Sequence, residues 1–486
     1  MELNIKNFSK IKEANITIDG ITVIAGENNT GKSTIGKILF SCFNSTKNIE
    51  EEIYSSKFIP ILKNLTYLMQ ELSKNNESIK QIPSLYSSLL GGTAVAAGAI
   101  GATAAATSAI GATAAATSAV LGATLLPVIG IPLAIGAAGA LSMIKNKKQD
   151  SNNLNIDNLI NDINNIISDL TNENNEKNAY YVLKDNLSKY IDIEDKKNIY
   201  IIKKYSDRIQ EYINIPNKKI AYKIINDYFK SIFNNQINSR IDKDSISEIN
   251  IMDLSFKFKN DKCIESKYNN TYSKNVYFID NPFVLDKKYD EKYMTKYEYD
   301  LIEKLLYNTE EVNTTEQILA EEKLEKIYDK LSEAVNGKII NRDNDFYLEE
   351  ENFTEPISIH SLSAGLKSFA VIKMLIEKNA LKEEDILILD EPEIHLHPKW
   401  QLLYAEIIVL LQKIFNVYII VTTHSPYFLE AIEMYSNKYD IEDKNNYYLS
   451  DIENNYAVFN LVNDSVEKIY SKMAEPIDEM EDFINN

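Results

Sequence analysis

The chain has 486 residues, of which 25% are charged, and a formal net charge of −19. This length allows roughly two to four domains, and the composition is that of a globular protein. The acidic balance argues against a surface coated with basic residues for nucleic acid. The two cysteines, Cys42 and Cys263, exclude a disulfide scaffold and a cysteine-rich metal site. The N-terminus has no signal-peptide pattern, which predicts a protein of the reducing cytoplasm.

A glycine-containing loop lies between a predicted strand, Ile21–Ala25, and a predicted helix, Ile35–Phe43. The loop fits the pattern G-x-x-x-x-G-K-[ST], which predicts that backbone N–H groups and the helix dipole bind nucleotide phosphates. Its residues are Gly26, Glu27, Asn28, Asn29, Thr30, Gly31, Lys32, Ser33 and Thr34. Lys32 is expected to reach the β- and γ-phosphates, and the Ser33 hydroxyl to hold Mg²⁺.

Two predicted strands in the C-terminal half end in polar residues. Ile386–Leu389 is a continuous apolar run, typical of a central parallel strand, and it leads into Asp390 and Glu391. Asp390 is predicted to bind Mg²⁺ and Glu391 to polarise the attacking water, because phosphoryl transfer depends on charge neutralisation and positioning. The next strand, Val417–Val421, leads to His424, which is predicted to contact a γ-phosphate or align the water.

A Ser–Gly turn precedes the apolar helix predicted over Phe369–Ile376. Ser363, Ala364 and Gly365 lie at the start of this helix, where backbone N–H groups form a second anion site. Taken alone, the pattern favours a simple helix N-cap over an anion site.

Together these residues resemble the ABC-type ATPase head of the SMC, RecF and OLD-like groups. Gly26–Thr34 resembles the Walker A motif, and Leu362–Leu366 the signature. Ile386–Glu391 resembles Walker B, and His424 the switch histidine. The stretch Asp390–Pro398, DEPEIHLHP, is similar to that of OLD-like AAA-family ATPases of prokaryotic anti-phage systems. The resemblance implies an ATPase with slow or trigger-dependent turnover that uses ATP and Mg²⁺.

In such heads, a complete site combines Walker A of one subunit with the signature of another. The resemblance therefore implies a head-to-tail homodimer that holds two ATP molecules, or a higher oligomer, with a separate effector or sensor protein as partner. Two departures are Ala364 in place of a glycine and the lack of a Q-loop glutamine at Phe278–Pro282. Only 62 residues follow His424, so no Toprim nuclease domain is expected. The less favoured alternative is a DNA-associated repair or scanning ATPase of the RecF/SMC type.

The predicted fold class is α/β: a P-loop ABC-type ATPase head with a long, mostly helical insertion that bears an Ala/Gly-rich apolar hairpin. Residues 1–45 and 276–432 are predicted to form the head, and residues 46–275 an arm-like insertion. Residues 433–486 are predicted to be an acidic tail packed on the head. Apolar residues recur at helical spacing from Tyr54 to Leu72, where Pro60 is expected to kink the helix or delay its start.

The insertion contains an uncharged segment at residues 81–144. These 64 residues hold nine of the 15 glycines and a perfect ten-residue tandem repeat that begins at Ile100. The segment is long enough for two membrane crossings of ~20 residues each, and lysines on both sides fit a hairpin with cytoplasmic ends. Membrane association, which would place the protein at the inner membrane, is favoured over a soluble packed hairpin and over a disordered loop.

Overall fold

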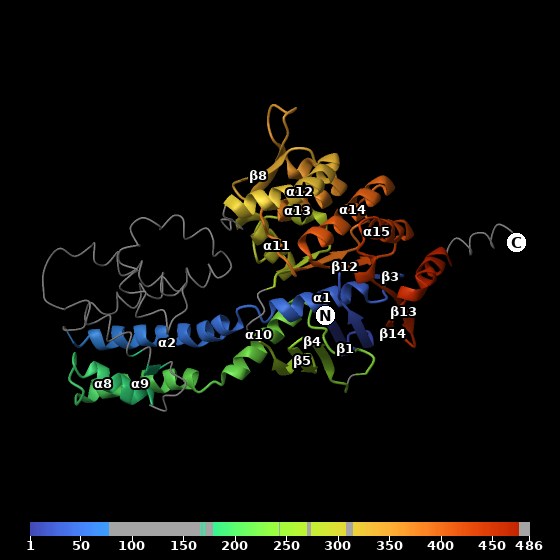
Figure 1. Cartoon of the computed structure of the whole chain (residues 1–486). Coiled ribbons are helices and arrows are strands. Elements are labelled where there is room, and N and C mark those ends of the chain that lie inside the picture. The colour runs from blue at the N-terminus through green and yellow to red at the C-terminus, as the bar shows by residue number, and fades with distance from the viewer. Residues whose placement is uncertain are drawn as a thin grey trace. The chain divides into compact units, whose positions relative to one another are not determined.

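The computed structural model describes residues 1–76, 166, 169, 170, 178–242, 244–269, 274–307 and 314–475. The hairpin predicted for residues 81–144 lies outside these ranges. The chain divides into two compact units, Met1–Lys47 with Tyr222–Asn486 and Asn48–Ala221, and Figure 1 shows the elements of each. Of the helices in the described ranges, none combines the length and the apolar character that a membrane span requires.

The first unit is built on a mixed sheet whose described strands run in the order β6-β5-β4-β1-β2-β14-β13-β3-β12-β11-β7. The strands are β1 Glu2–Phe8, β2 Ile11–Thr17, β3 Ile21–Gly26, β4 Ser247–Ile251, β5 Leu254–Lys259, β6 Lys262–Lys267, β7 Val276–Ile279, β11 Ile386–Asp390, β12 Tyr418–Thr423, β13 Asn446–Glu453 and β14 Tyr456–Leu461. A smaller antiparallel sheet has the order β10-β9-β8, with β8 Lys338–Arg342, β9 Asp345–Glu349 and β10 Ile357–Ser358.

Helices cover both faces of the parallel part of the large sheet. Strands β7, β11, β12, β3 and β13 are parallel neighbours, so their carboxyl ends meet at one edge. One face packs against α13 Ala364–Glu377, α14 Pro398–Phe415 and α15 Pro426–Lys438. The other face lies against α1 Lys32–Asn44, where a Cβ at Gly36 would come 2.7 Å from Ile388. Figure 1 shows α1 and the α13–α15 group on opposite sides of the strands. Burial on both faces explains why these strands are continuous apolar runs.

The first unit also contains α11 Lys296–Tyr307, α12 Thr314–Ala334 and most of α10 Asn217–Ile232. Its short 3₁₀ turns are η2 Pro282–Asp286, η3 Ile359–Ser361, η4 Glu442–Lys444 and η5 Asn463–Ser465. Residues 247–267, which the sequence analysis placed in the helical insertion, form β4, β5 and β6 and extend the sheet from β1. Their apolar residues alternate along the chain, which is the period of a half-buried strand. Residues 446–461, placed in the tail, form β13 and β14 inside the sheet.

The described part of the second unit is helical. It contains α2 Ile49–Ser73, α8 Ala179–Leu187 and α9 Lys196–Ile213, which share one apolar core. α2 continues through Pro60, where the sequence predicted a kink. The residues beside it, Phe58, Ile61 and Leu62, are buried in that core, and tertiary packing of this kind supplies most helix stability in proteins.

Candidate functional site

The loop between β3 and α1 presents an uncapped helix N-terminus. Gly31 is the N-cap of α1, and no side chain caps this end, so the first N–H groups of the helix can donate to a ligand. Gly26 and Gly31 have φ angles of 152° and 87°, in the region that favours glycine. A Cβ at Gly26 would also overlap the carbonyl oxygen of Ser450 on β13. The two glycines are therefore required by backbone conformation and by close packing.

Lys32 lies at the centre of the site and is 3% exposed. Its Nζ donates to the carbonyl oxygens of Gly26 at 2.9 Å and Glu27 at 2.7 Å. The same atom lies 3.7 Å from Glu391 Oε1. Burial lowers the pKa of Lys32, and the carboxylates across the pocket oppose that shift.

Asp390 ends β11, directly beside Thr422 of the parallel strand β12. Thr422 Oγ1 donates to Asp390 Oδ1 at 2.5 Å. Burial raises the pKa of Asp390, while hydrogen bonds from Thr422 and Ser33 act in the opposite direction. A buried carboxylate next to a serine hydroxyl is a donor set that suits Mg²⁺, which usually takes one or two protein ligands and completes its shell with phosphates and water. Among the described residues, no group of three or more His, Cys, Asp or Glu side chains is arranged to hold a metal ion.

Glu391 and His424 face each other at the ends of adjacent strands. The distance from His424 Nδ1 to Glu391 Oε1 is 3.8 Å. Glu391 has a φ of 49°, which is uncommon for a residue other than glycine. Its backbone N–H donates to the carbonyl oxygen of Thr422 at 3.1 Å and to Thr422 Oγ1 at 3.0 Å. These two bonds hold the strained backbone that directs the Glu391 side chain toward Lys32.

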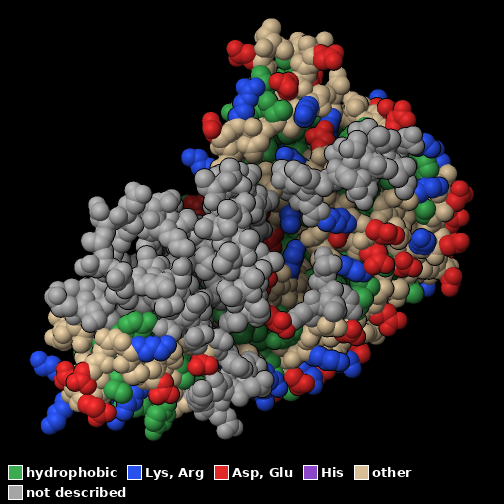
Figure 2. All heavy atoms as spheres, turned by 60° about the vertical axis from the view of Figure 1, so that its left-hand side comes forward, with side chains coloured by type: hydrophobic (Ala, Val, Ile, Leu, Met, Phe, Trp, Pro, Cys, Tyr) green, Lys and Arg blue, Asp and Glu red, His purple; other side chains and the backbone are tan. Residues whose placement is uncertain are grey.

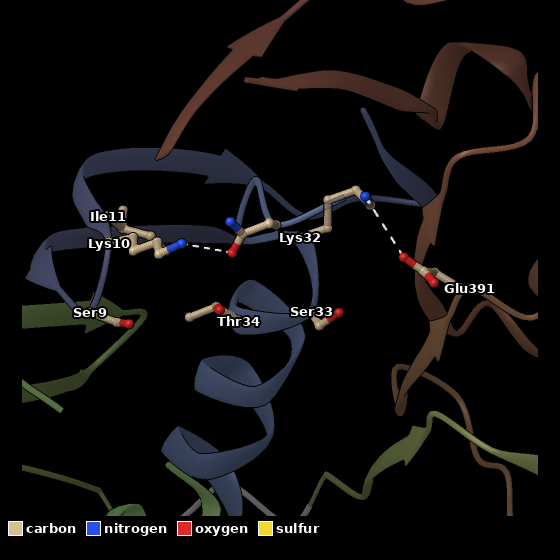
Figure 3. Close-up of a pocket in the computed structure, with 9 residues that line it drawn as sticks. Ser9, Lys10, Ile11, Lys32, Ser33, Thr34 and Glu391 are labelled. Atoms are coloured by element: carbon tan, nitrogen blue, oxygen red, sulfur yellow. Dashed lines mark hydrogen bonds and ion pairs between the residues drawn. The ribbon is translucent and has the colours of Figure 1, made fainter. Parts of the chain in front are cut away.

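The pocket beside the loop has a volume of about 260 Å³. It is lined by Ser9, Lys10, Ile11, Asn29, Gly31, Lys32, Ser33, Thr34 and Glu391. Figure 3 shows Lys32 and Glu391 pointing toward each other, with Ser33 and Thr34 on the first turn of α1. Lys10 Nζ donates to Asn29 Oδ1 at 2.7 Å. The contribution of the β1–β2 turn, Ser9 and Lys10, and of Ile11 at the start of β2 was not predicted, because a single lysine in a polar turn carries no signal.

A second brace of the loop also escaped the sequence analysis. Thr30 Oγ1 shares a hydrogen bond of 2.8 Å with Ser450 Oγ, and the same serine donates to the carbonyl oxygen of Ala25 at 3.1 Å. Lys472 Nζ lies 3.2 Å from Glu27 Oε1. The C-terminal residues thus contact the phosphate loop directly.

The signature turn lies elsewhere in the unit. Ser363 is the N-cap of α13, and its Oγ accepts from the Leu366 N–H at 3.4 Å. A Cβ at Gly365 would lie 3.1 Å from the carbonyl oxygen of His395 and 3.2 Å from the Trp400 ring. Ser363, Ala364 and Gly365 are not among the residues that line the pocket. Within one chain, Lys32, Ser33, Asp390, Glu391 and His424 are linked by direct contacts, and no contact of this kind joins them to Ser363 among the described residues.

A strand, a glycine loop and a helix N-terminus, faced by acidic ends of neighbouring parallel strands, define a P-loop nucleotide-hydrolysing site. The AAA ATPase domain family matches residues 1–429. The chain belongs to this family, and it is an ATPase.

Three solved structures are similar to this chain over nearly its whole length. A Smc head bound to the C-winged helix domain of ScpA is 10% identical and covers 97% of this chain and 98% of its own, with a TM-score of 0.36. A Smc head with a coiled coil and joint from Pyrococcus yayanosii is 12% identical and covers 98% and 99%, with a TM-score of 0.32. A Smc head with an extended coiled coil from Pyrococcus furiosus, bound to the C-terminal domain of ScpA, is 12% identical and covers 98% of both chains, with a TM-score of 0.30.

Proposed function

We propose that the protein is an ATP-gated dimeric switch that binds ATP with Mg²⁺ between two heads. The observation that carries the proposal is the division of the motifs. The Lys32 pocket is assembled within one chain, whereas the signature turn at Ser363 lies outside it. A second copy would bring its Ser363, Ala364 and Gly365 to the phosphates bound at the first copy's loop.

The residues predicted for the site each have a role that their surroundings support. The N–H groups at the start of α1 and the Lys32 ammonium bind the phosphates, the latter after exchanging its two carbonyl partners for phosphate oxygens. Ser33 and Asp390 hold Mg²⁺, which supplies charge neutralisation when bound. Glu391 orients and polarises the attacking water, and His424 contacts the γ-phosphate.

ATP acts as a switch in this arrangement because it binds the closed pair of heads better than separate heads. A ligand shifts an equilibrium only by its differential affinity for the two states. The exposed position of Ser363 is compatible with a partner approaching it. ATP binding would thus close the pair, and hydrolysis would open it.

The setting we propose is prokaryotic anti-phage defence, with a separate sensor or effector protein. Its support is the similarity of Asp390–Pro398 to OLD-like ATPases. Action at a membrane through residues 81–144 belongs to the same proposal and depends on their uncharged composition alone. The DNA-associated alternative predicts ATP-dependent DNA binding that weakens steeply with salt. Figure 2 shows Lys and Arg side chains interspersed with Asp and Glu on the face that it displays.

The test is the Glu391→Gln variant, which keeps the size of the side chain and removes its charge. With ATP and Mg²⁺ it should elute as a dimer in light-scattering chromatography, and its phosphate release should be about 10²–10³-fold slower than that of the wild type. ADP should leave it monomeric. A variant that hydrolyses ATP at the wild-type rate, or a chain that stays monomeric with ATP, would contradict the proposal.

A further inference from the structure

A second acidic side chain lies behind the site, three residues after Asp390. Glu393 is 3% exposed. Its Oε1 accepts from Thr423 Oγ1 at 2.5 Å and from the His424 backbone N–H at 3.2 Å. The same oxygen lies 3.9 Å from His424 Nδ1. Its other oxygen, Oε2, is buried and has no hydrogen-bond partner among the described residues.

Burying the Glu393 carboxylate costs free energy, and a side chain that only filled space would not need to carry a charge. A carboxylate without full hydrogen bonding loses much of its solvation when it is removed from water. The described structure places one ion-pair partner within reach of Glu393, the His424 ring. An amide or a hydroxyl could tie the strand end equally well, so the choice of a carboxylate points to the imidazole.

We propose that Glu393 is a positioning residue of the ATPase site, which acts through His424. Its Oε1 contacts both the backbone that carries the imidazole and one edge of the ring. At 3.9 Å the carboxylate acts on Nδ1 through its charge, which favours a hydrogen on that nitrogen and the ring orientation that turns Nδ1 toward Glu393. The opposite nitrogen, Nε2, is then the one presented to the γ-phosphate. The inference depends on the role proposed above for His424.

Glu391 and Glu393 divide the work between them. Glu391 lines the pocket and lies 3.7 Å from Lys32 and 3.8 Å from His424, whereas Glu393 is absent from the pocket lining. If Glu391 alone oriented the ring, it could not also hold the attacking water. Support of His424 from behind leaves the Glu391 carboxylate for the water.

The test is a double-mutant cycle on kcat, with ATP affinity measured separately by fluorescent-nucleotide titration. We expect Glu393→Ala to lower kcat about tenfold or more while the Kd for ATP changes less than about threefold. In the His424→Ala background, the same change should lower kcat no further, because residues that act as a unit are not additive. Glu393→Gln, which keeps an acceptor oxygen and the side-chain size, should fold as the wild type does and lose part of the rate.

The imidazole itself provides a second readout, since the chain has only four histidines. In protein labelled at histidine ¹³Cε1, the signal that disappears in His424→Ala should shift in Glu393→Gln, and the other three should not. Glu406→Gln is the matched control: Glu406 is also 3% exposed, and it accepts from Lys438 Nζ at 2.8 Å and Tyr439 OH at 2.7 Å. This control should lower the unfolding temperature and leave kcat unchanged.

The inference is overturned if Glu393→Gln shifts no His424 signal, if the losses from Glu393→Ala and His424→Ala add, or if His424→Ala leaves kcat unchanged. Its outcome is separate from that of the proposed switch. Loss of ATP-dependent dimerisation in Glu391→Gln would remove the switch, while the coupling of Glu393 to His424 would still be read from the cycle.

Discussion

The phosphate loop and the signature turn are both glycine-containing helix starts, yet their surroundings differ. The start of α1 has no side-chain cap and is enclosed by Lys32, the acidic ends of β11 and Ser450. The start of α13 is capped by the exposed side chain of Ser363, whereas Gly365 two residues later is buried. A helix N-terminus can therefore bind phosphate within a single chain when no side chain caps it and charged groups from neighbouring strands face it. The signature turn has only its helix, and in the proposed switch it meets a phosphate that another copy binds.

The largest effect should come from removing the positive charge of Lys32 at the phosphate loop. Lys32→Ala should lower kcat/KM by about 10³-fold, because the proposed function assigns this buried ammonium to the phosphates. The measurement is steady-state phosphate release across ATP concentrations. Lys10→Ala, at the edge of the same pocket, is the comparison and should cost far less. Equal losses for the two lysines would break the distinction between the centre and the rim of the pocket.

The next largest effect should come from changing Ser363 at the signature turn. Ser363→Arg should bind ATP with the wild-type Kd and lower kcat by about 10²-fold, because a large side chain displaces its own signature turn from the phosphates of the second head while the heads still pair. Mixing it with Lys32→Ala should restore about a quarter of the wild-type rate, since half of the dimers are mixed and each mixed dimer has one of its two sites intact. A mixture as inactive as its components would show that the signature acts within its own chain.

A smaller effect is expected where the phosphate loop is braced. Ser450→Ala removes the hydroxyl pair with Thr30 and should lower the free energy of unfolding by about 1 kcal/mol. It should also raise the KM for ATP a few-fold, because the loop loses a fixed point. Ser436→Ala is the matched control: its hydroxyl is also buried and accepts from Asn445 Nδ2 at 2.8 Å. Chemical denaturation and ATPase assays should show similar destabilisation for both variants and a raised KM for Ser450→Ala alone.

The smallest effect on ATP hydrolysis should follow deletion of residues 91–144. The pocket is built from residues of the first unit, so kcat and KM should stay within about twofold of the wild type. The same deletion should abolish flotation with liposomes in the presence of ATP and Mg²⁺. Flotation that persists without the segment, or a full-length chain that never floats, would remove the membrane part of the proposal.

The sequence predicted those parts of the site in which the functional residues directly follow or precede a recognisable strand or helix. Gly26–Thr34 follows an apolar strand and opens an apolar helix in the sequence, and it lies between β3 and α1 in the structure. Asp390 and His424 come together because their strands are parallel neighbours, which continuous apolar runs indicate. Their roles in catalysis remain predictions.

The parts that escaped prediction depend on contacts between distant residues. Ser450 meets Ala25 across 425 residues, and a serine within a strand carries no sign of that contact. The sequence shows Glu393 only as one residue of the DEPEIHLHP motif. It does not indicate that the side chain is buried, because this burial results from the packing of the loop after β11. The strands β4, β5 and β6 were hidden by the helical pattern before them in the chain, although their own alternation has the period of a strand.

The position of β13 and β14 between β2 and β3 has a consequence for biosynthesis. During translation, β2 and β3 leave the ribosome early. The edges that pair with β14 and β13 stay unpaired until residue 461 has left the exit tunnel. Pairing over such long sequence separations is slow, and open apolar edges invite association with other nascent chains. The helices of the second unit, with contacts closer in sequence, can form in the meantime. The nucleotide pocket is therefore completed late in translation, so premature stop codons before this hairpin should yield aggregates rather than partly active fragments.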